Sequence, residues 1–480
     1  MKSGKVQTNK HFTGRVFERS RLAQIAEADE ASIVVVYGRR RVGKTELIEQ
    51  AFKNRNLLKF EGIEGESERS QMRHVLTQLS KYALDPLIAK LDLKSWVEIF
   101  QLIAQHTAKG KWTVFLDELQ WLANYRNQLI AELKYVWDNH FRQNQSLVLV
   151  LCGSSPSFII NKVLHSRALY NRSQHEMHLQ EFDLHETKAF LGSKRSYREV
   201  MDAILTVGGI PEYLKYLNRE SSVFMGLCRN TFTAGGFFSN EYQRIFTSSL
   251  GDNKNYIKII EYLSRQKFTT RQKIARHIRS ETGGTLTALL KDLELCGFIT
   301  RYTPYNLDER SLLTRYNIRD QYLQFYFKFV EPVYKEIQNG DFNKNPVSPI
   351  NTETYLKWLG YSFERFCRKQ HRFIAQLLGF ESVLYKAGAF FNRQSHAQDE
   401  GYQIDLVFDR ADRVVTVCEI KYLQSKATRK IITDFERKLA LFPNPKKATI
   451  HKVLITTEGA DEELTNYFDK ILTLEDFFSS

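Results

Sequence analysis

Residues 32–50 constrain the fold more than any other part of the 480-residue chain. They begin with the apolar, largely β-branched run IVVVY, which is typical of a buried strand in a parallel sheet with helices on both faces. The sequence GRRRVGKT follows directly and matches the phosphate-loop pattern G-x-x-x-x-G-K-[ST]. The next residues, ELIEQAF, have the pattern of a helix whose N-terminus faces the bound anion. Strand, loop and helix in this order predict a nucleotide-binding α/β domain.

The phosphate loop assigns roles to individual residues. We expect its backbone N–H groups to surround the phosphates, Lys44 to reach the β- and γ-phosphates, and Thr45 to place its hydroxyl on Mg²⁺. The residues expected to bind ATP in this segment are Gly38, Arg39, Arg40, Arg41, Val42, Gly43, Lys44, Thr45 and Glu46. A basic, glycine-bearing turn without a ligand is the alternative, and the flanking strand and helix patterns argue against it.

A second apolar run, WTVFL, ends in two adjacent acidic residues, Asp117 and Glu118. Ligands of open α/β sheets bind at the carboxyl ends of the strands, which is where these carboxylates would lie. We therefore expect Asp117 to hold Mg²⁺ together with Thr45. We expect Glu118 to orient or deprotonate the water that attacks the γ-phosphate.

Two later segments offer further candidates for phosphoryl chemistry. The apolar strand at 146–152 ends in Gly-Ser-Ser, and a serine at that tip can contact the γ-phosphate or the water. Ser155 is the first choice and Ser154 the second, with a helix cap as the alternative role. Arg172 is the candidate for stabilising transition-state charge on the transferred phosphoryl group, and an ordinary surface arginine is its alternative.

Length and composition set limits on the kind of protein. A chain of 480 residues should divide into about three domains. The absence of an apolar run of about 20 residues, and a polar start to the chain, predict a cytoplasmic protein without membrane contact. Five scattered cysteines in apolar surroundings predict buried free thiols. A net charge of +14 favours a polyanionic partner.

Six motifs follow one another along the first half of the chain: FTGR, GRRRVGKT, FLDELQWL, LCGSS, LYNR and GGIPEYL. In this order and spacing they resemble those of the archaeal-type ATPases, a branch near the AAA+ and STAND NTPases. In that family the GG-x-P element closes over the nucleotide, so the resemblance implies that Gly209 and Pro211 lie near the base. The sequence departs from the family at Asn171, where relatives often carry glycine.

The middle of the chain has the pattern of three short helices followed by a hairpin, which predicts a winged helix-turn-helix. Residues 265–279 contain six basic residues and no acidic one. We expect three of these side chains to meet DNA phosphates and two threonines to begin the helix that enters the groove. These residues are Lys273, Arg276, Arg279, Thr285 and Thr287. A packing adaptor of the same shape is the alternative.

The last part of the chain begins with a predicted helix at 353–377 and continues with strands. One strand carries Asp405, and the next carries Glu419 and Lys421, which share a face because they are two residues apart. Carboxylates from two neighbouring strands can bind Mg²⁺, and a lysine beside them can position or activate water for attack on a phosphodiester. The alternative is an edge strand with a surface ion pair.

This arrangement resembles that of the PD-(D/E)xK nucleases. The resemblance implies an endonuclease that uses Mg²⁺ or Mn²⁺, with Asp405, Glu419 and Lys421 in the active site and Glu364 as a further metal ligand. Gln403 stands where many members carry an acidic residue. This departure leaves Asp405, Glu419 and Lys421 in place and affects the position at which those members hold a second metal ion.

These patterns predict an α/β protein with a P-loop ATPase core at 1–180, a helical lid at 181–250, a winged helix at 251–335 and a nuclease-like domain at 352–480. ATP would control DNA binding and cleavage. One alternative is a STAND-type regulator whose last domain binds DNA or a protein without cutting. A chaperone-like motor is another alternative, and a homo-oligomer or a protein partner is compatible with each of these functions.

Overall fold

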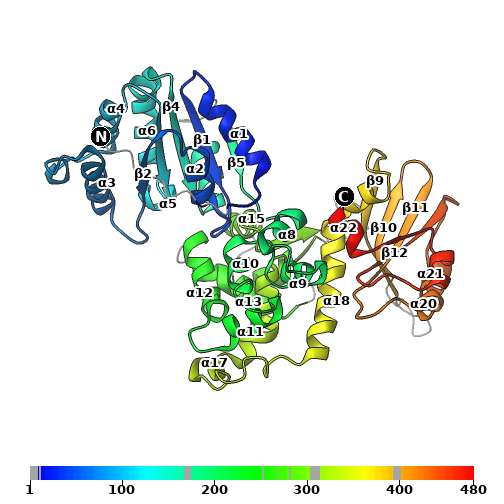
Figure 1. Ribbon diagram of the computed structural model, residues 1–480. Coiled ribbons are helices and arrows are strands. Elements are labelled where there is room, and N and C mark those ends of the chain that lie inside the picture. The colour runs from blue at the N-terminus through cyan, green and yellow to red at the C-terminus, as the bar shows by residue number, and fades with distance from the viewer. Residues whose placement is uncertain are drawn as a thin grey trace.

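The computed structural model describes residue 9 and residues 12–166, 175–250, 253–266, 269–279, 283–302, 314–392 and 402–479. Figure 1 shows an N-terminal α/β domain, a helical central part and a C-terminal α/β domain, with the long helix α18 standing between the last two. None of the helices in these segments is long and apolar enough to cross a membrane.

The N-terminal domain is built on a parallel sheet with the strand order β2-β3-β4-β1-β5. Its strands are β1 (Ser32–Tyr37), β2 (Asn56–Glu61), β3 (Trp112–Asp117), β4 (Leu147–Gly153) and β5 (His175–His178). Alternate residues of β1 enter two different apolar cores: Ile33 and Val35 pack into one, and Val34 and Val36 into the other. The prediction of a strand buried on both faces is confirmed.

Helices cover both faces of this sheet. They are α1 (Val16–Glu27), α2 (Lys44–Ala51), α3 (Glu68–Ala83), α4 (Trp96–His106), α5 (Leu119–Leu122), α6 (Gln128–Asn139) and α7 (Pro156–Phe158). Local signals fix some of their starts. In α4, for example, Ser95 and Glu98 form a capping box in which each side chain accepts a backbone N–H of the other residue.

The central part follows as two groups of helices. The first group is α8 (Leu184–Leu191), α9 (Tyr197–Val207), α10 (Pro211–Leu217), α11 (Val223–Phe232) and α12 (Phe237–Leu250). The second is α13 (Lys254–Ser264), α14 (Arg271–Ile278) and α15 (Gly284–Leu295), beside an antiparallel sheet of β6 (Thr269–Thr270), β8 (Arg315–Ile318) and β7 (Ile299–Tyr302). The short helices α16 (Gln321–Phe325) and α17 (Tyr334–Asn339) lead onward. The five helices of the first group lie in residues 181–250, the segment expected to form a lid, and are called the lid below.

The C-terminal domain contains a mixed sheet with the strand order β13-β12-β11-β10-β9. Its strands are β9 (Tyr385–Asn392), β10 (Tyr402–Arg410), β11 (Val414–Lys421), β12 (Thr449–Thr456) and β13 (Lys470–Leu472). Its helices are α18 (Thr352–Lys369), α19 (His371–Leu377), α20 (Lys430–Leu441), α21 (Glu462–Tyr467) and α22 (Leu474–Ser479). The single helix expected at 353–377 is two helices, because Gln370 leaves the helical conformation (φ −92°, ψ 22°).

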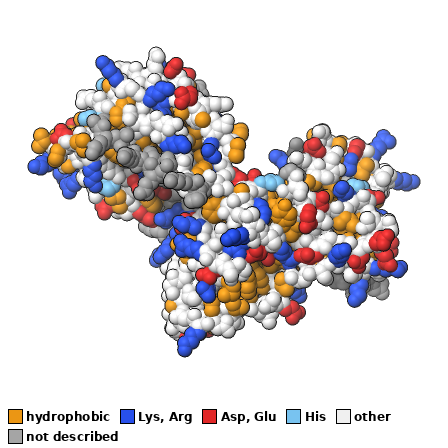
Figure 2. Space-filling view, in the orientation of Figure 1, with side chains coloured by type: hydrophobic (Ala, Val, Ile, Leu, Met, Phe, Trp, Pro, Cys, Tyr) orange, Lys and Arg blue, Asp and Glu red, His pale blue; other side chains and the backbone are white. Residues whose placement is uncertain are grey.

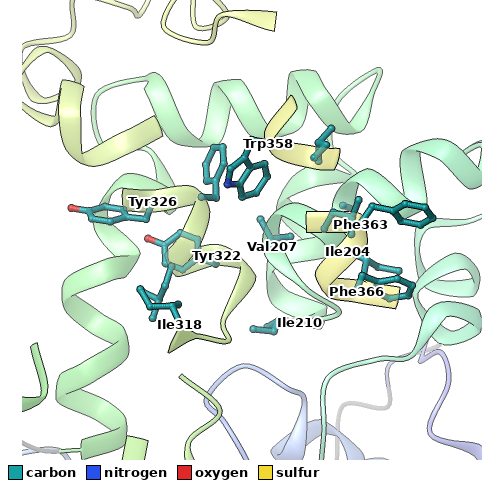
Figure 3. Packing of buried hydrophobic residues seen from close by; sticks show 14 of the residues in the cluster. Ile204, Val207, Ile210, Ile318, Tyr322, Tyr326, Trp358, Phe363 and Phe366 are labelled. Atoms are coloured by element: carbon teal, nitrogen blue, oxygen red, sulfur yellow. The ribbon is translucent and has the colours of Figure 1, made fainter. Parts of the chain in front are cut away.

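One apolar core joins the lid, the rest of the central part and the C-terminal domain. Figure 3 shows Ile204 and Val207 of α9, Tyr322 of α16, and Trp358 and Phe363 of α18 in the same cluster. The two cores of the N-terminal domain contain none of these described residues. The lid is therefore packed onto the C-terminal domain through a shared interior. The five cysteines, all in described segments, are buried free thiols, as predicted.

Candidate functional site

The phosphate loop joins β1 to α2, and its glycines meet specific steric demands. A Cβ atom at Gly38 would lie 2.2 Å from the carbonyl oxygen of Leu179, whereas Gly43 has a positive φ of 89° and open space beside it. Lys44 is buried, and its Nζ donates to the carbonyl oxygens of Gly38 and Arg39, both at 3.0 Å. The ammonium group is thus held inside the loop, where phosphate oxygens would replace the carbonyl partners.

Thr45 and Asp117 come together at the carboxyl edge of the sheet. The Thr45 hydroxyl donates to Asp117 Oδ2 at 2.8 Å. Burial and the neighbouring Glu118 raise the pKa of Asp117, while Lys59 of β2, 3.6 Å away, opposes this rise. A hydroxyl and a carboxylate are the hard oxygen ligands that Mg²⁺ prefers, so the pair suits the expected metal. Lys59 did not stand out in the sequence, although it is a basic residue within an apolar strand.

Glu118 occupies the left-handed backbone region (φ 50°), an uncommon conformation for a non-glycine residue that clusters at functional sites. Its Oε2 accepts hydrogen bonds from the Ser154 hydroxyl at 2.6 Å, the Ser154 N–H at 3.2 Å and Gln120 Nε2 at 2.7 Å. Ser155 is the buried N-cap residue of α7. The second-choice serine, Ser154, is therefore the one that holds the expected catalytic glutamate, and Gln120 is an additional partner.

Two of the loop arginines contact other parts of the protein. Arg39 forms an ion pair with Asp320, the N-cap residue of α16. Arg41 pairs with Glu241 of α12 at 2.9 Å and lies over the ring of Phe237, 4.6 Å from its centroid. Burial raises the pKa of Glu241, and Arg41 opposes that rise. These ion pairs connect the phosphate loop to the central part of the chain, a role that the sequence pattern did not indicate.

The other residues expected to bind nucleotide lie around the same loop. Val42 is buried, Glu46 accepts a hydrogen bond from Asn9, and Arg40 is partly exposed. The candidate Arg172 lies outside the described residues.

The GG-x-P element forms the joint between α9 and α10. The Phe182 N–H donates to the Gly209 carbonyl at 2.7 Å, and a Cβ on Gly209 would lie 2.1 Å from the Phe182 carbonyl oxygen. Pro211 occupies the first turn of α10. Arg15 of the FTGR motif donates to the Val42 carbonyl at 3.0 Å from its Nη2. It also donates to the carbonyl of residue 180, at 2.7 Å. Arg15 thereby links the phosphate loop to the segment that begins the lid.

The three expected nuclease residues lie on the neighbouring antiparallel strands β10 and β11. Asp405 Oδ2 accepts a hydrogen bond from the backbone N–H of Ile420 at 3.1 Å. Ile420 stands between Glu419 and Lys421 on β11. Lys421 Nζ lies 2.7 Å from Glu419 Oε1. Asp405 and Glu419 are buried, whereas one-third of the Lys421 side chain is exposed. The structure brings the set together and leaves its lysine accessible.

Glu364 of α18 joins this cluster through Gln403 of β10. Gln403 Nε2 donates to Asp405 Oδ1 at 3.2 Å and to Glu364 Oε2 at 3.5 Å, and Arg368 also pairs with Glu364 at 3.5 Å. Burial, Glu419 and Glu364 raise the pKa of Asp405 to about 7. The Gln403 amide thus bridges the carboxylates of Asp405 and Glu364.

Lys438 of α20 is a further member that the sequence analysis missed. Its Nζ contacts both oxygens of Glu419, at 2.8 and 3.0 Å, and Asp434 at 2.9 Å. Two lysines thus neutralise the buried Glu419, and within the described segments no group of three or more Asp, Glu, His or Cys side chains is arranged to hold a metal ion. One sequence signal was present: Lys438 lies three residues after the buried Phe435, on the same face of an amphipathic helix.

Comparison with known proteins supports the ATPase assignment. Residues 12–217 match the model of an ATPase domain found predominantly in Archaea. The uncharacterized protein MJECL04 of Methanocaldococcus jannaschii is 25% identical over 447 residues, which cover 90% of this chain and 92% of that protein.

Similar solved structures include the Walker-type ATPase PABY2304 of Pyrococcus abyssi, with 18% identity, a TM-score of 0.49, and coverage of 67% of this chain and 97% of that one. The ORC2 protein of Aeropyrum pernix has 12% identity, a TM-score of 0.45, and coverage of 71% and 99%. The family match coincides with the phosphate loop, the acidic strand end and the GG-x-P joint. Residues 12–217 are an archaeal-type ATPase domain.

Proposed function

We propose that this protein is a Mg²⁺-dependent ATPase that couples its nucleotide state to DNA binding and to cleavage of DNA by its C-terminal domain. The observation that carries the proposal is the pair of ion pairs from the phosphate loop, Arg39 with Asp320 and Arg41 with Glu241. A loop that binds phosphate through its backbone changes its electrostatic surroundings when the nucleotide changes. Its own arginines would transmit that change to the central part.

In the ATPase reaction, Lys44 binds the β- and γ-phosphates, Thr45 and Asp117 hold Mg²⁺, and Glu118 positions the attacking water. The bound Mg²⁺ would neutralise charge on the phosphate oxygens. Ser154 fixes the orientation of the Glu118 carboxylate through two hydrogen bonds, as the 2.6 Å and 3.2 Å distances indicate.

The second group of central helices supports DNA binding. Three helices beside a small antiparallel sheet are the elements of a winged helix, and α15 would be the helix that enters the groove. Lys273, Arg276 and Arg279 are exposed, and so are Thr285 and Thr287 at the start of α15. Among the side chains coloured in Figure 2, Lys and Arg are spread over all three parts of the face shown. The proposal of DNA binding therefore depends on the five exposed residues named above and not on the overall distribution of basic side chains.

Replacing Lys273, Arg276 and Arg279 together with alanine is expected to weaken binding to duplex DNA and to flatten its salt dependence. Each lost phosphate contact reduces the slope of log affinity against log salt by about 0.9. Fluorescence anisotropy between about 50 and 200 mM salt measures both quantities. The control replaces the exposed Lys90, Lys94 and Lys109 of the N-terminal domain, which removes the same charge. An affinity that does not fall with salt would contradict the phosphate contacts.

The C-terminal domain supports phosphodiester cleavage through Asp405, Glu419 and Lys421. A helix packed on a mixed sheet, with a carboxylate on each of two neighbouring strands, is the arrangement expected of a PD-(D/E)xK nuclease. A bound Mg²⁺ or Mn²⁺ would polarise the phosphodiester. The exposed end of Lys421 would orient the attacking water, while Lys438, which is itself buried, pairs with Glu419.

Lys421→Ala and Asp405→Ala are each expected to reduce plasmid nicking by at least about 100-fold, because positioned acid–base groups contribute about 10²- to 10⁴-fold. Nicking is measured as conversion of supercoiled to open-circular plasmid in Mg²⁺ and in Mn²⁺. Lys426→Ala, at an exposed lysine five residues after Lys421, is the matched control. Equal nicking by the wild type and both variants would remove the nuclease assignment.

One observation favours a second function, a STAND-type regulator whose last domain binds without cutting. Lys438 and Lys421 together contact both oxygens of Glu419, which leaves that carboxylate fully paired. In a binding domain this cluster would serve as a buried polar anchor. Wild-type protein that binds DNA but does not nick plasmid in either metal would favour this second function.

A further inference from the structure

Strand β11, which carries Glu419 and Lys421, ends against the lid of the ATPase. Lys421 is the last residue of β11, and the next residue, Tyr422, packs on helix α9. The guanidinium carbon of Arg198 lies 3.9 Å from the centroid of the Tyr422 ring, and its Nε donates to the Tyr422 hydroxyl at 2.7 Å. That hydroxyl donates in turn to Asp202, one turn further along α9. Tyr422 is thus held by two side chains of the lid.

Arg198 also holds the backbone beyond Tyr422. Its Nη1 donates to the Leu423 carbonyl at 2.6 Å, to Glu458 Oε1 at 2.7 Å and to the Thr457 hydroxyl at 3.3 Å. Thr457 itself bonds the N–H and the carbonyl of Leu423, at 2.8 and 2.9 Å. One lid arginine therefore fixes the ends of two neighbouring strands, β11 and β12.

The opposite end of α9 leads into the GG-x-P joint. Gly208 lies ten residues after Arg198, which corresponds to about 15 Å along a helix. Between these two ends the helix is packed firmly: Ile204 and Val207 enter the shared core, and the Thr206 hydroxyl lies 2.9 Å from that of Tyr355 on α18. A displacement at the joint would therefore be carried to Arg198 by a well-packed helix.

We propose that Arg198 and Asp202 are positioning residues for the nuclease-like site, which set the place of Lys421 through Tyr422 according to the state of the ATPase lid. The inference rests on the proposed nuclease function for its consequence in catalysis. The proposed nucleotide-dependent restraint of residues 419–423 does not require that the protein cleave DNA. A static domain contact would show the same distances but no response to nucleotide.

The test is hydrogen–deuterium exchange of the full chain with and without Mg²⁺ and ATPγS. We expect ATPγS to change the exchange of amides 419–423 in the wild type at least twofold, and Arg198→Ala to abolish that change while its affinity for ATPγS stays within twofold of the wild type. Tyr422→Phe keeps the ring and removes only the hydroxyl contacts, so it should reduce the response without unfolding the domain. Arg229→Ala, at an exposed lid arginine paired with Glu220, is the control.

The outcomes separate the two claims. A nucleotide response that persists in Arg198→Ala, or one that is absent from the wild type, overturns the positioning role whether or not the protein nicks DNA. A response that depends on Arg198 in a protein that does not nick supports the positioning role and removes only the nuclease function. When the wild type nicks, Arg198→Ala should reduce the fold-change in nicking rate that ATPγS causes, by at least fivefold.

Discussion

Lys44→Ala is expected to weaken the binding of ATP with Mg²⁺ by at least about 30-fold. Lys44 is buried within the phosphate loop, and its ammonium would form charge-assisted hydrogen bonds with the phosphates. The loss of one such contact costs about 2 kcal/mol, which equals about a 30-fold change in Kd. Isothermal titration with ATPγS, which avoids turnover, measures the effect.

The protein fold should tolerate this change, since Lys44 Nζ contacts only two carbonyl oxygens of its own loop among the described residues. Lys53→Ala, at an exposed lysine just beyond α2, is the control for charge. An unchanged ATPγS affinity in Lys44→Ala would show that nucleotide does not bind at this loop.

Glu118→Gln is expected to lower the rate of ATP hydrolysis at least about 100-fold while ATP affinity stays within threefold. Glutamine has nearly the same shape, so contacts with Ser154 and Gln120 remain possible, but it cannot accept a proton from water. Steady-state phosphate release gives the rate, and titration with ATPγS gives the affinity. Glu64→Gln, at an exposed site outside this cluster, is the control. Hydrolysis at the wild-type rate would show that Glu118 is not the base.

The local elements of the site could be predicted from the sequence because local chemistry determines them. The β-branched run of β1 is buried on both faces, and the loop glycines meet steric demands that other residues would violate. The same holds for Glu419 and Lys421, which share a face of β11 through strand alternation, whereas a register shift between Ile404 and Val407 interrupts the alternation of β10 at Asp405. Neighbouring strands then bring these residues together, as the register of β10 and β11 shows.

Contacts between distant elements could not be predicted in this way. The partners of Arg39 and Arg41 lie some 200 to 280 residues away, and their choice depends on how the central part packs on the loop. Lys438 reaches Glu419 only because α20 crosses the sheet at that point. The distinction between Ser154 and Ser155 depends on the turn after β4, which places one hydroxyl on Glu118 and the other at a helix start.

Because of the distant ion pairs, the phosphate loop has two functions in this account. Its backbone and Lys44 would bind nucleotide, while Arg39 and Arg41 form ion pairs with the central part. The shared apolar core (Figure 3) continues the connection to the C-terminal domain. The Arg198 contacts extend it to the end of β11. The ATPase domain and the C-terminal domain are therefore connected through ion pairs and packed side chains of the central part.

The central claim is that nucleotide state controls the chemistry of the C-terminal domain. The most direct test measures plasmid nicking by the full chain without nucleotide and with saturating ATPγS. Allosteric coupling of about 1–3 kcal/mol corresponds to a change of about 5- to 150-fold, and we expect a change in rate within this range. The change should be absent in Lys44→Ala. Equal nicking rates with and without bound ATPγS in the wild type would contradict the account.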